Sequence, residues 1–149
     1  MTDPDERSLP PAVFETERLV AADWQTEFDE QAFRVYGDIE VAQTLSGVPE
    51  PSVESMRKTI EKLIVRNRRW PPHWASWPVF SKSSAELVGA LLMKPLPDAN
   101  GNDTAFIEIG WHLRRDHWGQ GLAIEGARKL KEIAFQQLDQ LELFAVTGL

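Results

Sequence analysis

The sequence contains no cysteine, which removes one whole class of chemistry from consideration. Disulfide frameworks, thiolate nucleophiles and thiolate metal sites are excluded, and the absence fits a reducing compartment. Long apolar runs are also missing, since no stretch approaches the roughly 20 apolar residues that a membrane-spanning helix needs. The first residues, Met1 to Pro11, are polar and Pro-rich rather than signal-like. We therefore expect a cytoplasmic protein without a membrane partner.

Positive charge is scarce as well, because the net charge of the chain is −7. An acidic protein repels phosphate backbones, so we expect no nucleic-acid partner. The window from Gly110 to Glu132 is an exception, with five cations against three acids. The cations are Arg114, Arg115, Arg128, Lys129 and Lys131, and the acids are Asp116, Glu125 and Glu132. A small anionic ligand could bind in this window.

The length of 149 residues and the hydrophobic content of 42% predict one domain with its own core. We expect residues 1–12 to form a disordered tail and residues 13–149 to form the domain. Val13–Ala22 is typical of a leading strand, and Asp23 is a candidate N-cap for a helix that Gly37 ends. Four apolar residues at helical spacing give that helix a buried face: Trp24, Phe28, Ala32 and Val35.

The middle of the chain predicts a second helix and a strand pair. Ser52 can cap the helix, whose buried face would hold Met56, Ile60, Leu63 and Asn67. Residues 70–78 crowd tryptophan and proline together, which favours an extended segment whose indoles either line a pocket or pack over the sheet edge. Residues 79–82 and 87–94 are typical of a hairpin around Ser83 and Ser84, and residues 95–103 of a loop.

The most informative segment starts with a strand over Thr104–Leu113. Alternation places Phe106, Glu108, Gly110 and His112 on one face, and Ile107, Ile109, Trp111 and Leu113 on the other. The carboxylate of Glu108 thus lies in the middle of the strand, opposite the more apolar face. His112, with Asp116 and His117, also forms a possible metal site, but the spacing is poor and a surface role is the stronger interpretation.

A glycine turn and a helix follow this strand. Gly119 and Gly121 would let the backbone approach a ligand closely, and a helix would begin near Leu122. Its expected buried face holds Ala123, Ala127, Leu130, Ala134 and Leu138. Unpaired N–H groups and the positive end of the helix dipole suit a pyrophosphate. Nucleotides, dinucleotides and coenzyme A all remain possible on this ground, although the Walker and three-glycine dinucleotide patterns are absent.

The order of these segments resembles that of a known family. The carrying segments are Ile107–Leu113 (IEIGWHL) and Trp118–Ala127 (WGQGLAIEGA), supported by Phe14–Val20 (FETERLV) and Gly37–Val41 (GDIEV). Together they resemble the GNAT superfamily of N-acetyltransferases, and most of all its branch that modifies the N-terminal alanine of ribosomal proteins. Trp118 departs from the general superfamily pattern and matches that branch.

The resemblance implies a mixed α/β (α+β) fold, with a central, mostly antiparallel sheet and flanking helices. It also implies acetyl-CoA as co-substrate and a primary amine as acceptor, either a protein N-terminus or a small molecule. The backbone of Gly119, Gln120, Gly121, Leu122 and Ala123, beside Trp118, would hold the pyrophosphate, and Leu113 would pair with the pantetheine arm. Glu108 would be the catalytic base. The alternative for Glu108 is a simple pair with a neighbouring cation.

The family pattern continues beyond the point at which this chain stops. Residues 141–146 are typical of the next strand, which in the family precedes a loop with an asparagine, a further helix and a closing hairpin. We expect these elements, and the family's tyrosine proton donor, to be missing, and Tyr36 to be no substitute. A homo-oligomer or a completing chain would cover the exposed edge. The alternatives to the enzyme are a degenerate, non-catalytic module that binds CoA or protein, and an unrelated α/β domain.

Overall fold

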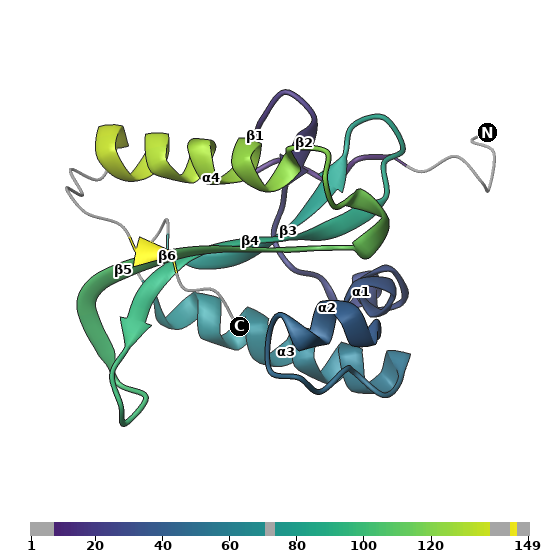
Figure 1. The fold of residues 1–149 in the computed structure, drawn as a ribbon, viewed down its shortest axis with the longest axis horizontal. Coiled ribbons are helices and arrows are strands. Elements are labelled where there is room, and N and C mark those ends of the chain that lie inside the picture. Colours follow the sequence, from purple (N-terminus) through teal and green to yellow (C-terminus); the bar gives the residue numbers. More distant parts are fainter. Residues whose placement is uncertain (1–7, 71–73, 138–143, 146–149) are drawn as a thin grey trace.

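In the computed structural model a sheet lies between two helical layers. The structure describes residues 8–70, 74–137 and 144–145. One helix, α4 (Leu122–Glu132), covers one face of the sheet, whereas the other face carries α1 (Asp29–Tyr36), α2 (Ile39–Gln43) and α3 (Val53–Arg69) (Figure 1). The expected tail over residues 1–12 lies partly outside the described residues.

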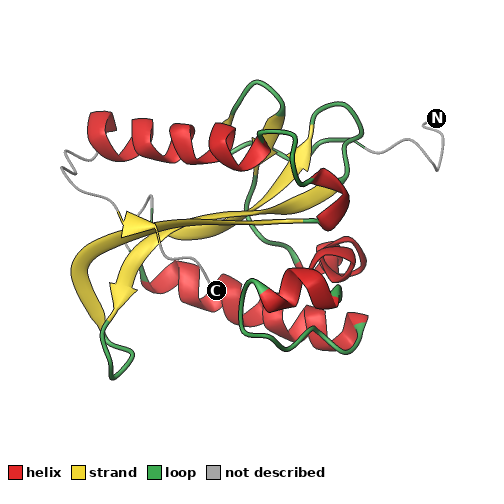
Figure 2. Ribbon diagram, in the orientation of Figure 1, coloured by secondary structure: helices red, strands yellow, loops and turns green. Residues whose placement is uncertain are grey.

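The sheet has six strands in the order in which they occur along the chain. They are β1 (Phe14–Glu15), β2 (Leu19–Ala21), β3 (Ala75–Ser81), β4 (Leu87–Pro97), β5 (Asp103–Leu113) and β6 (Phe144–Ala145). The first five pair antiparallel and β6 runs parallel to β5, as the yellow strands of Figure 2 show. A central, mostly antiparallel sheet with flanking helices is therefore confirmed. The strand expected over residues 141–146 is described only at Phe144–Ala145.

The single leading strand expected over Val13–Ala22 is instead a pair of short strands. The chain turns back after Thr16, whose N–H donates to the carbonyl of Leu19 at 2.9 Å, so that Phe14 lies opposite Ala21. Thr16 and Arg18, the polar residues in the middle of that segment, bond to Glu125 on α4. Their partners lie more than 100 residues away, and local alternation could not indicate them.

The first helix begins later than expected. A short 3-10 turn over Thr26–Phe28 precedes α1, so Asp23 is not its N-cap, although Gly37 does end it. Trp24 precedes the helix and is buried, and its indole N–H donates to the hydroxyl of Ser76 at 3.2 Å. The short α2, which Asp38 caps, was not predicted.

The second helix matches the expectation at its N-terminus and on its buried face. The Ser52 hydroxyl accepts a hydrogen bond from Ser55 N–H at 3.0 Å, and Met56 and Ile60 are buried. Asn67 is held by the backbone of Ser76, to which its side chain both donates and accepts. This bond fixes α3 against the start of β3.

Strands β3 and β4 are longer than the sequence indicated. Ala75 to Pro78, expected to be merely extended, belong to β3, and β4 continues to Pro97 through residues expected to form a loop. Pro78 has no N–H to donate, but its carbonyl accepts from Ala22 N–H at 3.1 Å, just beyond the residues of β3 that pair with β2. The hairpin around Ser83 and Ser84 and the strand ending at Leu113 are confirmed.

Two hydrophobic clusters lie on opposite faces of the sheet. One packs α4 against Leu91 and Met93, and the other packs α1 and α3 against Phe80 and Ala90. Leu130 and Ala134 are buried as expected, whereas Ala123 and Ala127 are only half-buried, and Leu122 and Gly126 of α4 and Ile133 of the following π-helical turn (Ile133–Gln137) are buried as well. Gly126 is needed there, because a Cβ would lie 2.6 Å from the Leu91 side chain. Leu138, expected on that face, lies outside the described residues.

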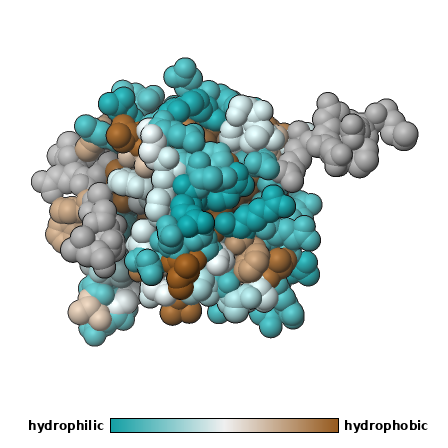
Figure 3. Space-filling view, turned by 45° about the vertical axis from the view of Figure 1, so that its right-hand side comes forward, coloured by the Kyte–Doolittle hydropathy of each residue, from teal (hydrophilic) through white to brown (hydrophobic). Residues whose placement is uncertain are grey.

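Hydrophilic side chains cover most of the face seen in Figure 3, and hydrophobic side chains occur in small separate spots. Within the described residues, no helix combines the length and apolar character needed to cross a bilayer.

Candidate functional site

The glycine turn between β5 and α4 has the backbone conformation that its sequence predicts. Gly119 has a φ of 77° and Gly121 a φ of 79°, both in the left-handed region. An L-residue in that region costs roughly 1–2 kcal/mol. Nothing lies within 4 Å of the position that a Cβ on Gly119 would take, so this backbone is open to a ligand. Gly121 is the N-cap of α4, which begins at Leu122 as expected.

The start of α4 presents backbone donors that no side chain caps among the described residues. Helix starts of this kind favour anions because the first N–H groups point outward and the dipole is positive there. Leu122 is buried and Ala123 half-buried at this end. Gln120 is turned away instead, since its side chain donates to the Asp116 carbonyl at 3.2 Å.

A bond network that the sequence did not reveal fixes the glycine turn. Arg18 donates to the Gln120 carbonyl at 2.9 Å and to the Glu125 carboxylate at 2.7 Å, and Thr16 also donates to Glu125. Burial opposes ionisation of Glu125, but these hydrogen bonds outweigh it and lower its pKa. The β1–β2 hairpin is therefore a structural support of the turn. The only signal in the sequence was the segment Phe14–Val20, whose meaning depended on resemblance.

The cations of the window from Gly110 to Glu132 do not converge on the turn. Arg114 pairs with Glu86 and Asp116, and Arg115 pairs with Asp38 and Glu40. Lys129 pairs with Glu132 at 3.6 Å. These three cations are thus engaged by carboxylates, and the binding of a small anion in the window stays a prediction. The cation that contacts the turn is Arg18, which itself pairs with Glu125.

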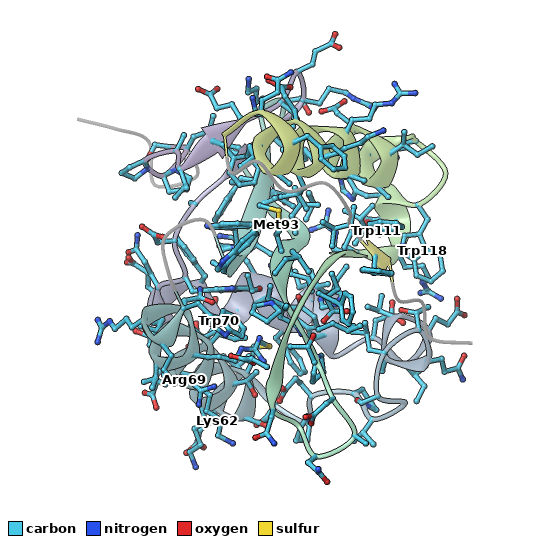
Figure 4. The ribbon with its side chains drawn as sticks, turned by 90° about the vertical axis from the view of Figure 1, so that its left-hand side faces the viewer. Lys62, Arg69, Trp70, Met93, Trp111 and Trp118 are labelled. Atoms are coloured by element: carbon cyan, nitrogen blue, oxygen red, sulfur yellow. The ribbon has the colours of Figure 1, made fainter. Side chains whose placement is uncertain are left out.

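Trp118 stabilises the turn from the other side. Its indole N–H donates to the Leu113 carbonyl at 2.9 Å, which links the end of β5 to the glycine segment. The ring itself remains 42% exposed. In Figure 4, Trp118 and Trp111 lie on the same side of the molecule, close to β6. The Leu113 carbonyl already accepts this hydrogen bond. The expected pairing of Leu113 with a pantetheine arm stays a prediction.

One cavity of about 820 Å³ joins the separate parts of the site. Gly119, Gly121 and the first residues of α4 line it, and so do Lys94 and Glu108, which residues 109–113 of β5 separate from the turn along the chain. Trp111, Leu113 and Trp118 also line the cavity, as do Thr44 and Leu45, which directly follow α2. Of the residues expected to bind or react, only Gln120 does not line this cavity.

Glu108 lies where the strand pattern placed it, on the face of β5 turned towards α1 and α3. Its carboxylate forms an ion pair with the ammonium of Lys94, directly opposite on β4. Both side chains are largely buried, with exposed fractions of 13% for Glu108 and 17% for Lys94. The expected alternative, a pair with a neighbouring cation, thus describes part of its environment. It does not remove Glu108 from the cavity.

Tyr36 reaches the same face of the sheet from α1. Its hydroxyl lies 2.8 Å from Nδ1 of His112, and burial raises the tyrosine pKa. Burial and then the charge of Arg66 lower the pKa of His112 to about 4, so its imidazole is neutral at pH 7. Sequence reasoning did not foresee this contact.

Two of the three candidate metal ligands contact each other, and the third has a partner on another element. His117 contacts Asp116 at 2.8 Å, while His112 contacts Tyr36 on another element. In the part of the chain that the structure describes, no group of three or more His, Cys, Asp or Glu side chains could hold a metal ion.

Comparison with known proteins identifies the fold and the family. The uncharacterized N-acetyltransferase p20 of Bacillus licheniformis is 26% identical over 83% of this chain, which spans 66% of that protein. An acetyltransferase of the GNAT family from Bacillus anthracis has a TM-score of 0.69 at 18% identity, covering 88% of this chain and 70% of its own. The ribosomal-protein acetyltransferase RimL in complex with coenzyme A has a TM-score of 0.65 at 16% identity, covering 89% and 72%.

The two structures show the shared fold, and the sequence profile gives the family. The profile of the acetyltransferase (GNAT) domain matches residues 18–148. That range includes Arg18 at the turn, the strand with Glu108, and the glycine turn with the start of α4. This chain therefore belongs to the acetyltransferase (GNAT) domain family, which is a family of acyltransferases.

Proposed function

We propose that this protein is an N-acetyltransferase that moves the acetyl group of acetyl-CoA to a primary amine, and that residues 13–149 form its catalytic domain. The observation that carries the proposal is the single cavity that holds both the glycine turn and Glu108. Anion-binding backbone at one end and a carboxylate at the other are what a reaction between a CoA thioester and an amine requires.

The proposed cofactor site consists of Leu113 and Trp118 to Ala123. The open backbone at Gly119 and the uncapped start of α4 fit a pyrophosphate, and Arg18 adds a cation beside Gly121. The exposed rings of Trp111 and Trp118 supply apolar surface for the rest of the molecule. When bound, acetyl-CoA supplies the acetyl thioester at the other end of the cavity.

In the proposed reaction, the nitrogen lone pair of the acceptor attacks the thioester carbonyl carbon, a C–N bond forms, and the C–S bond breaks. The amine must first be neutral, although its pKa is roughly 8 for an α-amine and about 10 for a lysine. Glu108 accepts the proton that the amine loses, directly or through water, and the CoA thiolate takes up a proton as it leaves. No covalent enzyme intermediate is required, which agrees with a chain that has no cysteine.

The alternative is a non-catalytic module that binds CoA but transfers nothing. The ion pair between Glu108 and Lys94 favours it, because the carboxylate is already engaged by a neighbouring cation. The two functions differ in turnover and not in binding, so they can be separated by one set of variants.

The first test measures binding of acetyl-CoA to the purified chain by isothermal titration calorimetry. Saturable binding is expected for the wild type, and Gly121→Glu should abolish it, because a carboxylate then occupies the anion site on a residue whose φ is 79°. Gly101→Glu is the matched control, since Gly101 has a φ of 80° in a distant turn. Absence of binding by the folded wild type would contradict the proposal.

The second test measures turnover with a screen of peptide N-termini and small amines. Thiol release can be followed with a thiol reagent, because the protein contributes no cysteine background. Glu108→Gln should keep acetyl-CoA binding and lower kcat by on the order of 100-fold or more, as expected for loss of a general base. Equal turnover in Glu108→Gln would refute its role. A wild type that binds but never releases thiol would support the non-catalytic alternative.

A further inference from the structure

Arg66, near the C-terminal end of α3, is a cation that the proposed reaction does not use. It lines the same cavity as Lys94 and Glu108. Its Nε atom is buried and has no hydrogen-bond partner. Among the described residues none forms an ion pair with its guanidinium, whose central carbon lies 5.2 Å from the centroid of the Trp70 ring. A half-buried guanidinium without a carboxylate is unusual, since buried charges are normally paired.

The charges around Arg66 do not compensate it. Lys94 and Glu108 pair with each other, and this pair is neutral as a unit. His112 on the same wall is neutral at pH 7 because its pKa is about 4. Arg66 therefore leaves this end of the cavity with one net positive charge, in a protein whose total charge is −7.

The place of Arg66 in the cavity decides which ligand this charge serves. The glycine turn, where the phosphates are proposed to bind, follows Leu113, and Leu113 lies five strand residues, or about 16 Å, from Glu108 along β5. Arg66 interacts electrostatically with Glu108, the proposed base, and is thus on the acceptor side. Its contact with Trp70 holds one face of the guanidinium, and the planar edge is the part that suits a carboxylate.

We propose that Arg66 binds a carboxylate of the acceptor while Glu108 receives the proton of its amine, so that the preferred substrates are amines with an acidic group close by. This inference rests on the proposed function. Two sources carry the required chemistry: a free amino acid, with its own carboxylate, and a peptide N-terminus followed by aspartate or glutamate. Arg66 is in this view a specificity residue, and the acceptor supplies the carboxylate that none of the described residues provides.

The test compares pairs of acceptors in which one member carries the carboxylate and the other carries an amide in its place. The peptides Ala-Glu-Ala and Ala-Gln-Ala, both amidated at the C-terminus, form one arm, and alanine with alanine amide forms the other. Loss of a charge-assisted hydrogen bond predicts a preference of on the order of 10- to 100-fold in kcat/KM for the acidic member in at least one arm. The arm with the preference identifies the source.

Variants then assign the preference to Arg66. Arg66→Gln should remove it, and Arg66→Lys should retain a smaller one. Arg69→Gln is the matched control, because Arg69 is exposed on α3, is labelled in Figure 4, and does not line the cavity. The ratio of the two acceptors within one variant cancels differences in overall activity, and comparing that ratio between variants cancels the difference in amine pKa between the acceptors.

Binding measured without turnover separates this inference from the proposed function. Each peptide is titrated against the chain and followed by NMR shifts, in wild type, Arg66→Gln and Arg69→Gln. If no acceptor is acetylated but the acidic peptide binds more tightly and loses this advantage only in Arg66→Gln, the enzyme proposal fails and the carboxylate site stands. If wild type shows no preference in either readout, or Arg66→Gln keeps it, the inference is wrong. Should Arg66→Gln not fold, the preference of Arg66→Lys is compared with that of the wild type. A smaller preference in Arg66→Lys supports the inference, and an equal one contradicts it.

Discussion

Replacing Gly89 by alanine should damage the junction on which the cofactor end of the cavity is built. Gly89 lies on β4 opposite Leu113. An added Cβ would meet the His112 carbonyl oxygen at 2.0 Å, and the His112 carbonyl carbon and the Leu113 Cα at 3.0 Å. These are backbone atoms of a central strand, so no side-chain rotation can relieve the contact.

The cost follows from the movement that the contact requires. Ordinary contacts begin near 3.4 Å, so β4 and β5 would have to separate by about 1.4 Å at this point, the difference between 3.4 and 2.0 Å. Overpacking typically costs about 1–3 kcal/mol, and loss of one ladder hydrogen bond adds about 1 kcal/mol. We therefore expect a loss of roughly 2–4 kcal/mol, which is a large part of a total of about 5–15 kcal/mol.

Urea unfolding followed by circular dichroism measures this loss directly. Thermal unfolding should show a decrease in Tm of roughly 2–4 °C for each kcal/mol in a domain of this size. Gly110→Ala is the control, because its Cβ would meet only the Leu92 side chain, at 3.1 Å, and that side chain can yield. Gly110→Ala should therefore cost less than about 1 kcal/mol. If Gly89→Ala unfolds at the same urea concentration as wild type, the close approach of the strands is not present in the molecule.

Two further predictions concern pH and the support of the glycine turn. The pKa of His112 is about 4 in the folded protein and 6.5 in the unfolded chain. Between these pH values the unfolded chain therefore binds more protons than the folded protein. Stability should fall as pH drops from 6.5 to 4, by on the order of 3 kcal/mol at 1.36 kcal/mol per unit. His112→Gln should flatten this dependence and His117→Gln should not; an unchanged slope in His112→Gln would disprove the assignment. Glu125→Gln should weaken acetyl-CoA binding several-fold, because Arg18 loses the carboxylate that holds it against the glycine turn. It should also lower the free energy of unfolding by about 1 kcal/mol. The control is Glu132→Gln, and equal affinity in both variants would contradict the supporting role.

Local signals predicted the part of the site that depends on local geometry. The alternation over Thr104–Leu113 identified the strand, and Gly119 and Gly121 identified a turn whose positive φ values only glycine adopts at little cost. Ser52 likewise predicted the start of α3. Each of these features is determined within a few residues, which is why the sequence alone could indicate it.

Features that depend on distant partners were not predictable in this way. Asp23 has the right chemistry for an N-cap, but the bond from Trp24 to Ser76 keeps the chain extended there. The buried side of α4 is set by the closeness of Leu91 to Gly126, and not by the helix's own pattern. The ion pair of Lys94 with Glu108 and the unpaired state of Arg66 require the pairing of β4 with β5 and the position of α3.

The bond between Arg18 and Glu125 joins residues that are 107 positions apart in the chain. Contacts of such high sequence separation form late, because the intervening chain must be closed first. During synthesis, the β1–β2 hairpin therefore emerges long before the helix to which it binds, and the glycine turn reaches its final shape only when the sheet between them has assembled. Affinity for acetyl-CoA would then be one of the last properties that the folding chain acquires. In a pulse-labelling experiment, acetyl-CoA binding would therefore distinguish fully folded chains from incompletely folded ones.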